Sequence, residues 1–178
     1  MQLALPAGFE LAEVAIAPGA DRHACGREAA ALVLARLGGT LAYDGTRPIV
    51  VGTTTAAISI THGRTRALAV AARVARLGID LVDDADDDRL ARIADRFLAP
   101  ERAIATSPRA RAACFAAKEA GLKALGLGLY DGGMFDDCVV SVLSLEPPRI
   151  MPGELTLVLG RTADATLAVV YSIATARS

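Results

Sequence analysis

The clearest pattern of hydrophobic and polar positions in the chain predicts a helix between Ser107 and Gly126. Ser107 is a good N-cap, Pro108 suits the first helical position, and Gly126 can adopt the left-handed conformation that ends a helix. At about 100° per residue, Phe115 and Leu122 project from the same side. This side of the helix is therefore expected to face the core.

Three charged residues lie on or beside this apolar side. Lys118 projects within it, Glu119 lies about 40° from Phe115, and Lys123 follows Glu119 by one helical turn. The chain otherwise uses Arg for its basic residues, so both lysines are in this helix. A core-facing carboxylate loses hydration energy unless a cation compensates it. The simpler alternative is a Glu–Lys pair on the surface, worth a few tenths of a kcal/mol.

Alternation and capping residues predict the other elements. Asp21 is expected to cap a helix that reaches about Leu37 and stops at Gly38. Strands are expected at residues 2–16, 49–51, 57–61, 66–75, 77–83, 134–144, 154–159 and 166–174. We interpret residues 66–75 and 77–83 as a hairpin.

Two stretches of the chain resemble each other. Residues 67–75 (ALAVAARVA) are similar to residues 166–174 (TLAVVYSIA), and each closes a run in which a helix is followed by strands. We therefore predict an α+β fold with two similar halves around a shared cleft. The predicted halves are residues 1–76 and 77–178.

The predicted strand at residues 77–83 (LGIDLVD) places a carboxylate among apolar residues. A period of two puts the odd-numbered Leu and Ile residues on one face and Gly78, Asp80 and Val82 on the other. Gly78 leaves space that a ligand or a close backbone would fill. The alternative is that Asp80 lies on a solvated edge of the strand.

An acidic run at residues 83–88 invites comparison with a calcium-binding loop. The spacing puts Arg89 where that loop needs Gly and Asp95 where it needs Glu. The acids are better explained by the N-terminus of an amphipathic helix, where the dipole favours negative charge. The Arg residues here either form a solvated face or would dock an acidic partner. They are Arg89, Arg92, Arg96, Arg102, Arg109 and Arg111.

Composition narrows the class of protein. The net charge of −1 argues against a nucleic-acid-binding protein. Three widely spaced cysteines favour neither a disulfide framework nor a zinc site, and they suit a reducing compartment. No apolar run is long enough for a membrane span, and the N-terminus lacks the features of a signal peptide. We therefore expect a cytoplasmic protein.

The remaining chemistry is that of a phosphate site. With only two histidines the sequence has no HExxH motif, and it has no GxSxG motif. Carboxylates at Asp80 and Glu119, the two lysines and His62 are suited to bind magnesium and phosphate together.

These residues lie in segments that resemble the signature motifs of the 4′-phosphopantetheinyl transferase superfamily. GIDLVD and FAAKEAGLK resemble its signature pair, and SITHG resembles a preceding S-x-S-H segment. The tail KALGLG is similar to that of holo-acyl-carrier-protein synthases. The additional preceding half resembles the pseudodimeric type that is associated with surfactin synthetase activation. The resemblance implies two similar α+β halves in a pseudodimer.

The resemblance also implies an activity. The 4′-phosphopantetheine arm of coenzyme A would be transferred to a serine of an acyl or peptidyl carrier protein, with release of 3′,5′-ADP. Asp80 and Glu119 would hold Mg²⁺ at the pyrophosphate. Lys118 and Lys123 would neutralise the pyrophosphate oxygens.

The resemblance implies further contacts at the nucleotide. His62 and Arg47 would bind the phosphates or the adenosine end of coenzyme A. Asp80, Glu119 and Lys123 would form the catalytic group. The serine proton would pass to Glu119 or to a water on the ion, and the residues do not decide between these two bases.

Two positions depart from the family pattern. Val82 stands where many pseudodimeric members have a third acidic ligand, and strand alternation points Asp83 to the face opposite Asp80. Gly63 follows His62 where a polar residue is common. Three hypotheses result: an active transferase, a family-fold protein that binds coenzyme A or a carrier protein but is inactive or repurposed, and an unrelated α+β binding module in which Asp80 and Glu119 never meet.

Overall fold

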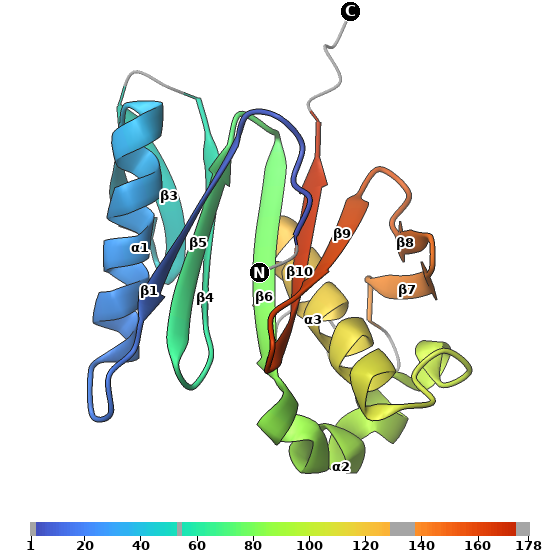
Figure 1. Ribbon diagram of the computed structural model, residues 1–178. Helices are drawn as coiled ribbons and strands as arrows, with labels where there is room; N and C mark the ends of the chain where they lie inside the picture. The colour runs from blue at the N-terminus through green and yellow to red at the C-terminus, as the bar shows by residue number, and fades with distance from the viewer. Residues whose placement is uncertain (1–2, 53–54, 129–137, 174–178) are drawn as a thin grey trace, which may run out of the picture.

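The computed structural model describes residues 3–52, 55–128 and 138–173. Two three-stranded sheets lie between the long helices α1 and α3, which gives four layers (Figure 1). The first elements are β1 (Phe9–Ala15), α1 (Arg22–Leu37), β2 (Gly39–Asp44), β3 (Arg47–Gly52), β4 (Ala57–His62) and β5 (Arg66–Ala72). Those that follow are β6 (Arg76–Asp83), α2 (Asp87–Phe97), α3 (Pro108–Ala124), β7 (Ser141–Leu145), β8 (Pro148–Met151), β9 (Thr156–Arg161) and β10 (Ala165–Ser172).

Both groups of elements have the same topology. Each contains a strand, a long helix, a two-stranded hairpin and two further strands, and the last strand lies in the centre of its sheet. The strand orders are β1-β5-β4 and β6-β10-β9, and all pairs are antiparallel. The predicted α+β fold with two similar halves is therefore confirmed. The boundary after residue 76 stays a prediction.

The ends of α3 are those that the sequence predicts. The Ser107 hydroxyl accepts a hydrogen bond from the Ala110 N–H at 3.2 Å. At the other end, Gly126 has a φ of 74°, and the Leu127 N–H donates to the Leu122 carbonyl at 2.9 Å. This arrangement is a Schellman motif, which satisfies carbonyls at the end of a helix. The predicted range of α1 is confirmed in the same way.

The predicted hairpin between residues 66–75 and 77–83 was wrong. β5 is hydrogen-bonded to β1 and β4, whereas β6 is hydrogen-bonded to β10. Because β5 is the central strand of its sheet, both of its edges are occupied and neither is left for β6. The two strands face each other across the core instead.

Several predicted strands extend beyond the part of the chain that the structure describes. Residues 134–137 of the predicted strand at 134–144 lie outside the described residues, as do residue 2 and residue 174 of two others. β7 begins at Ser141. The short strands β2 and β8 were not predicted.

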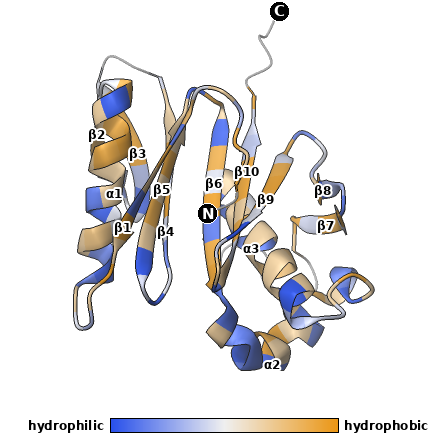
Figure 2. Cartoon of the chain, in the orientation of Figure 1, coloured by the Kyte–Doolittle hydropathy of each residue, from blue (hydrophilic) through white to orange (hydrophobic). Residues whose placement is uncertain are grey.

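Three apolar clusters lie between the layers. One packs α1 on the first sheet, the second joins the two sheets, and the third packs α3 and α2 on the second sheet. Figure 2 shows that α2 combines hydrophilic and hydrophobic residues, as the predicted amphipathic helix requires. Within residues 3–52, 55–128 and 138–173, no helix is both long and apolar enough to cross a membrane.

Helix α3 touches β6 backbone to backbone at Gly78. A Cβ atom added at Gly78 would lie 1.9 Å from the Ala120 carbonyl oxygen and 2.7 Å from the Ala124 nitrogen. The space beside Gly78 is therefore filled by a close backbone, which was one of the two predicted alternatives. This contact brings the inner face of α3 directly onto the strand that carries Asp80.

We expect Gly78→Ala to lower the free energy of unfolding by about 3 kcal/mol or more, because the neighbouring atoms are rigid backbone. Gly153→Ala is the matched control, since no atom lies within 4 Å of an added Cβ there. Urea unfolding of both variants measures the difference. Equal midpoints for the two variants would contradict the packing described here.

Candidate functional site

An open pocket of about 630 Å³ lies where β4, β6, α2 and α3 meet. Asp80 of β6, Glu119 of α3 and His62 of β4 all line it. The structure thus brings together three predicted site residues that are far apart in the sequence. Because Asp80 and Glu119 share one pocket, the hypothesis in which they never meet was wrong.

A second pocket, of about 530 Å³, shares a wall with the first. Asp80 and His62 line both pockets, and Lys123 lines the second. The rest of its wall comes from α1, the β2–β3 hairpin and β4, and includes His23 and Arg27. The two pockets together form a cleft to which both halves of the chain contribute.

Asp80 is 8% exposed, and its carboxylate forms a salt bridge with Lys123. Its Oδ1 accepts hydrogen bonds from Lys123 Nζ at 2.7 Å and from Thr61 Oγ1 at 3.1 Å. Lys123 Nζ also donates to the Ile79 carbonyl at 3.1 Å. The lysine therefore pairs with Asp80 across the cleft and not with Glu119 along the helix.

Glu119 is the carboxylate with the most unusual environment in this cleft. Burial and the nearby charge of Asp80 raise the pKa of Glu119 to about 7, although Lys123 and Arg89 act in the opposite direction. It receives no hydrogen bond from the described residues. Glu119 therefore exchanges a proton near neutral pH, and a cation between the two carboxylates would favour its ionised form.

His62 is surrounded by other basic groups. Burial lowers the pKa of His62, and the charges of His23, Lys123 and Arg22 lower it further. The rings of His23 and His62 meet edge to face, with centroids 5.1 Å apart. An anion bound in this part of the cleft would compensate the repulsion between these groups.

The structure corrects the position expected for Lys118. Its side chain is fully buried, and Nζ donates to both oxygens of Glu101 at 3.0 and 3.1 Å. Glu101 Oε1 also accepts the Val142 N–H at 2.9 Å, and the Phe97 ring lies 5.3 Å from the ammonium. Lys118 lines neither pocket of the cleft. The prediction that Lys118 points inward was correct, but its partner is the buried carboxylate of Glu101.

Arg47 also lies outside the two pockets. Its exposed side chain covers Gly126, where an added Cβ would lie 2.9 Å from the guanidinium. Its neighbours Thr46 and Pro48 line the second pocket. The structure therefore places Arg47 at the rim of the cleft, near the end of α3.

Asp83 is the last residue of β6 and lines the same pocket as Asp80. Its carboxylate lies beside Leu81 at Gly63, which is the face that strand alternation predicts. β6 stays paired with β10 through Asp83, which lies opposite Ala165, and a 3-10 helix begins at the next residue. Asp83 Oδ2 accepts the Arg64 N–H at 2.8 Å, and a Cβ at Gly63 would lie 2.6 Å from this oxygen. The two departures from the family pattern are thus linked, because Asp83 occupies the space above Gly63.

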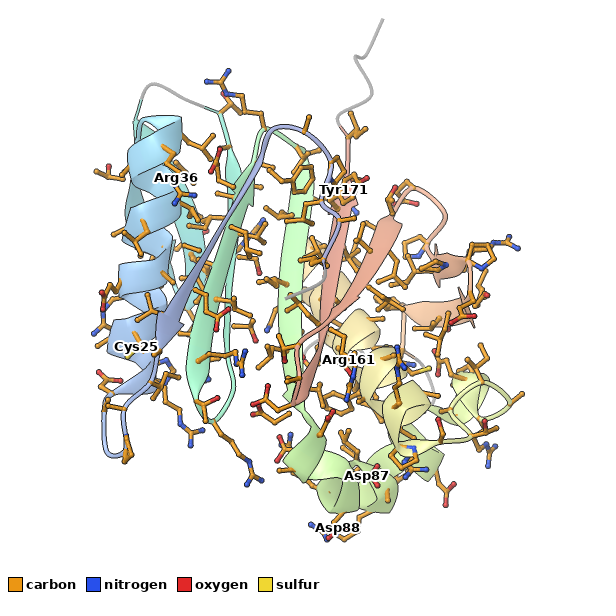
Figure 3. The ribbon with its side chains drawn as sticks, viewed as in Figure 1. Cys25, Arg36, Asp87, Asp88, Arg161 and Tyr171 are labelled. Carbon is orange, nitrogen blue, oxygen red and sulfur yellow. The ribbon has the colours of Figure 1, made fainter. Side chains whose placement is uncertain are left out.

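Arginines pair with the acidic run at residues 83–88. Three of its carboxylates pair with arginines from three different segments, and Figure 3 shows Asp87 on α2 and Arg161 above it. The pairs are Asp84–Arg161, Asp86–Arg64 and Asp87–Arg111. The run therefore fixes α2 at the edge of the cleft. Each pair that lies at the surface contributes little by itself.

The donor set fits Mg²⁺ that is shared with a phosphate ligand. Among the described residues, no group of three His, Cys, Asp or Glu side chains is arranged to hold a metal ion. Mg²⁺ commonly binds through one or two carboxylates, several waters and substrate phosphates. Asp80 and Glu119 supply two carboxylates. Burial and the charge of Asp80 raise the pKa of Glu119, and a cation bound beside them would offset both effects.

The fold and the site define an α+β protein with a cleft in which paired carboxylates and basic groups can bind a cation and a phosphate. The family described as the 4′-phosphopantetheinyl transferase superfamily matches residues 76–170, which is more than half of the chain. The chain therefore belongs to this superfamily of transferases, which use coenzyme A. Asp80, Glu119 and Lys123 lie in the matched region. No match is found among curated proteins.

Sequence reasoning missed three contacts that shape the site. Thr61 binds Asp80, Asp83 lies above Gly63, and Glu101 compensates Lys118. Only Thr61 had a local signal, because it stands directly before His62 in the SITHG segment. The other two contacts join segments whose neighbourhood the sequence pattern does not reveal.

We expect Lys118→Met to lower the free energy of unfolding by about 3–5 kcal/mol, because it leaves the Glu101 charge buried without a partner. The double variant K118M/E101Q should recover most of this loss, since a neutral amide oxygen can still accept the Val142 N–H. Urea unfolding measures both variants. Equal instability of the single and double variants would argue against this explanation.

The pKa of Glu119 predicts a pH-dependent stability. Between its ordinary pKa of 4.5 and about 7, the Glu119 carboxyl is protonated to a greater extent in the folded protein than in the unfolded chain. The contribution of Glu119 to the free energy of unfolding should therefore fall as the pH rises through this window. Glu119→Gln cannot ionise, so its stability relative to the unsubstituted protein should increase between about pH 4.5 and pH 8. Denaturant unfolding without divalent cations tests this, and parallel pH profiles would refute it.

Proposed function

We propose that this protein transfers the 4′-phosphopantetheine arm of coenzyme A to a serine of an acyl or peptidyl carrier protein, with the help of Mg²⁺. The observation that carries the proposal is the meeting of Asp80 and Glu119, from the two signature segments, in one pocket. Lys123 is bound to Asp80 beside them. A cytoplasmic location is part of the proposal.

The reaction requires charge neutralisation more than covalent help from the protein. The serine oxygen forms a bond to the phosphorus that carries pantetheine, and the serine proton passes to a base, for which Glu119 and a water are the candidates. The bond from this phosphorus to the bridging oxygen breaks and releases 3′,5′-ADP. Asp80 and Glu119 would hold Mg²⁺, which neutralises pyrophosphate charge when bound. Lys123 would stabilise the negative charge that develops on the departing phosphate.

The second pocket is suited to the nucleotide end of coenzyme A. His23, Arg27, His62 and Lys123 line it and provide basic groups for phosphate oxygens. Arg47 at the rim would reach an anionic group that extends past the end of α3. Because these residues come mainly from the first half, the proposed site belongs to the pseudodimeric type.

The carrier protein would approach next to α2. Arg89 pairs with Asp86 and Arg111 pairs with Asp87, so the basic surface predicted here is partly neutralised within the chain. Arg92 is exposed and has no acidic partner among the described residues. This residue is the best candidate on α2 for contact with an acidic carrier protein.

A second candidate function follows from Val82 and Gly63. In the part of the chain that the structure describes, no group of three His, Cys, Asp or Glu side chains is arranged to hold an ion, and Asp83 is engaged by the Arg64 N–H. A protein with this arrangement could bind coenzyme A or a carrier protein without transferring the arm. The two functions differ in whether an apo carrier protein gains mass.

Intact-mass spectrometry of several apo carrier proteins, incubated with the protein, coenzyme A and Mg²⁺, tests the proposal. We expect a gain of one phosphopantetheine and a rate that falls by two orders of magnitude or more in Asp80→Ala and Glu119→Ala. Glu28→Ala, an exposed carboxylate on α1 outside both pockets, is the control and should retain activity.

Removal of Mg²⁺ with a chelator should stop the reaction, and its return should restore it. Binding of coenzyme A without any mass gain would favour the second candidate function. A mass gain that survives both carboxylate variants would contradict the proposed roles of Asp80 and Glu119.

A further inference from the structure

The free edge of β6 is joined to β4 by side chains. The Ser59 hydroxyl accepts the Ile79 N–H at 3.1 Å, and the Thr61 hydroxyl accepts the Leu81 N–H at 3.3 Å. Both hydroxyls are buried, with Ser59 4% and Thr61 5% exposed. They occupy alternate positions of one strand and meet alternate N–H groups of the other, which satisfies the edge of β6 without a strand pair.

Thr61 differs from Ser59 by a second contact. Its hydroxyl lies 3.1 Å from Asp80 Oδ1. A hydroxyl group has one hydrogen to donate, and the Leu81 N–H already donates to the Thr61 oxygen. The hydroxyl hydrogen therefore points to Asp80, and the contact has a defined direction.

The two oxygens of Asp80 are consequently not equivalent. Oδ1 accepts from Thr61 and from Lys123, and both donors line the second pocket. No hydrogen bond to Oδ2 is found among the described residues. Asp80 also lines the first pocket, together with Glu119. Oδ2 is therefore the oxygen left for a cation that Glu119 shares.

We propose that Thr61 is a positioning residue, which holds Asp80 Oδ1 from the first half of the chain and thereby leaves Oδ2 for the divalent cation. This inference rests on the proposed cation site but does not depend on transfer to a carrier protein. Residues that orient a metal ligand commonly change metal affinity by 10- to 100-fold when they are replaced. The first half thus prepares a site whose two carboxylates belong to the second half.

The test measures binding of Mn²⁺, which prefers the same oxygen ligands as Mg²⁺, by electron paramagnetic resonance in the full chain. Thr61→Val should raise the dissociation constant for Mn²⁺ about 10-fold or more. Thr61→Ser keeps the hydroxyl and should bind Mn²⁺ as tightly as the unsubstituted protein does. Ser59→Ala is the matched control. It also removes a hydroxyl that accepts a hydrogen bond from a β6 N–H, but this hydroxyl is not hydrogen-bonded to Asp80. Thermal unfolding should show similar losses for Thr61→Val and Ser59→Ala.

Three results would overturn the inference. Equal Mn²⁺ affinities of Thr61→Val and Ser59→Ala would show that Thr61 acts only through the edge of β6. A Thr61→Ser variant that binds Mn²⁺ as weakly as Thr61→Val would show that the Thr61 hydroxyl does not position Asp80. Absence of Mn²⁺ binding to the unsubstituted protein would remove the proposed cation site as well. If Thr61→Val does not fold, Thr61→Ala replaces it, since the smaller side chain leaves room for a water at the Leu81 N–H.

Discussion

The direct contact between the backbones of α3 and β6 at Gly78 determines where the rest of the site can lie. A side chain at this position would meet the Ala120 carbonyl at 1.9 Å, so only glycine permits the observed distance between helix and strand. Asp80 is two residues further along the strand and Glu119 is one residue before Ala120. The close packing thus places two carboxylates in one pocket, and the apolar residues around them make that packing favourable.

The association of the two halves also relies on contacts that are not strand pairs. The apolar faces of β5, β6 and β10 meet between the sheets, while the hydroxyls of β4 satisfy the free edge of β6. Arg66 adds a polar link, because it pairs with Glu13 in the first half and with Asp164 in the second. A hydroxyl that accepts from the edge keeps a hydrogen to donate, whereas a paired backbone would not offer one to Asp80. Joining the halves in this way therefore gives the site an additional donor.

The local sequence pattern predicted most helices and strands and their buried faces, but it did not predict which elements lie next to each other. The caps at Ser107 and Gly126 and the period of the strand at 77–83 depend on residues close in sequence, so both were predicted correctly. The proposed hairpin failed because alternation specifies which face is buried and not which strand lies beside it. Glu101 could not be recognised, since its partner Lys118 belongs to another segment.

The adjacent residues Lys118, which is fully buried, and Glu119, which is half-buried, show how one helix can carry two charges with opposite consequences. Lys118 is matched by both oxygens of Glu101, so its charge is compensated within the folded chain. Glu119 receives no hydrogen bond from the described residues, and burial with Asp80 raises its pKa to about 7. The first charge helps to fix α3 against β7, and the second remains unfavourable until a proton or a cation arrives. Because α3 is rigid, folding already places Glu119 near Asp80, and a proton or cation that bound between the two carboxylates would relieve their repulsion without rearrangement of the helix.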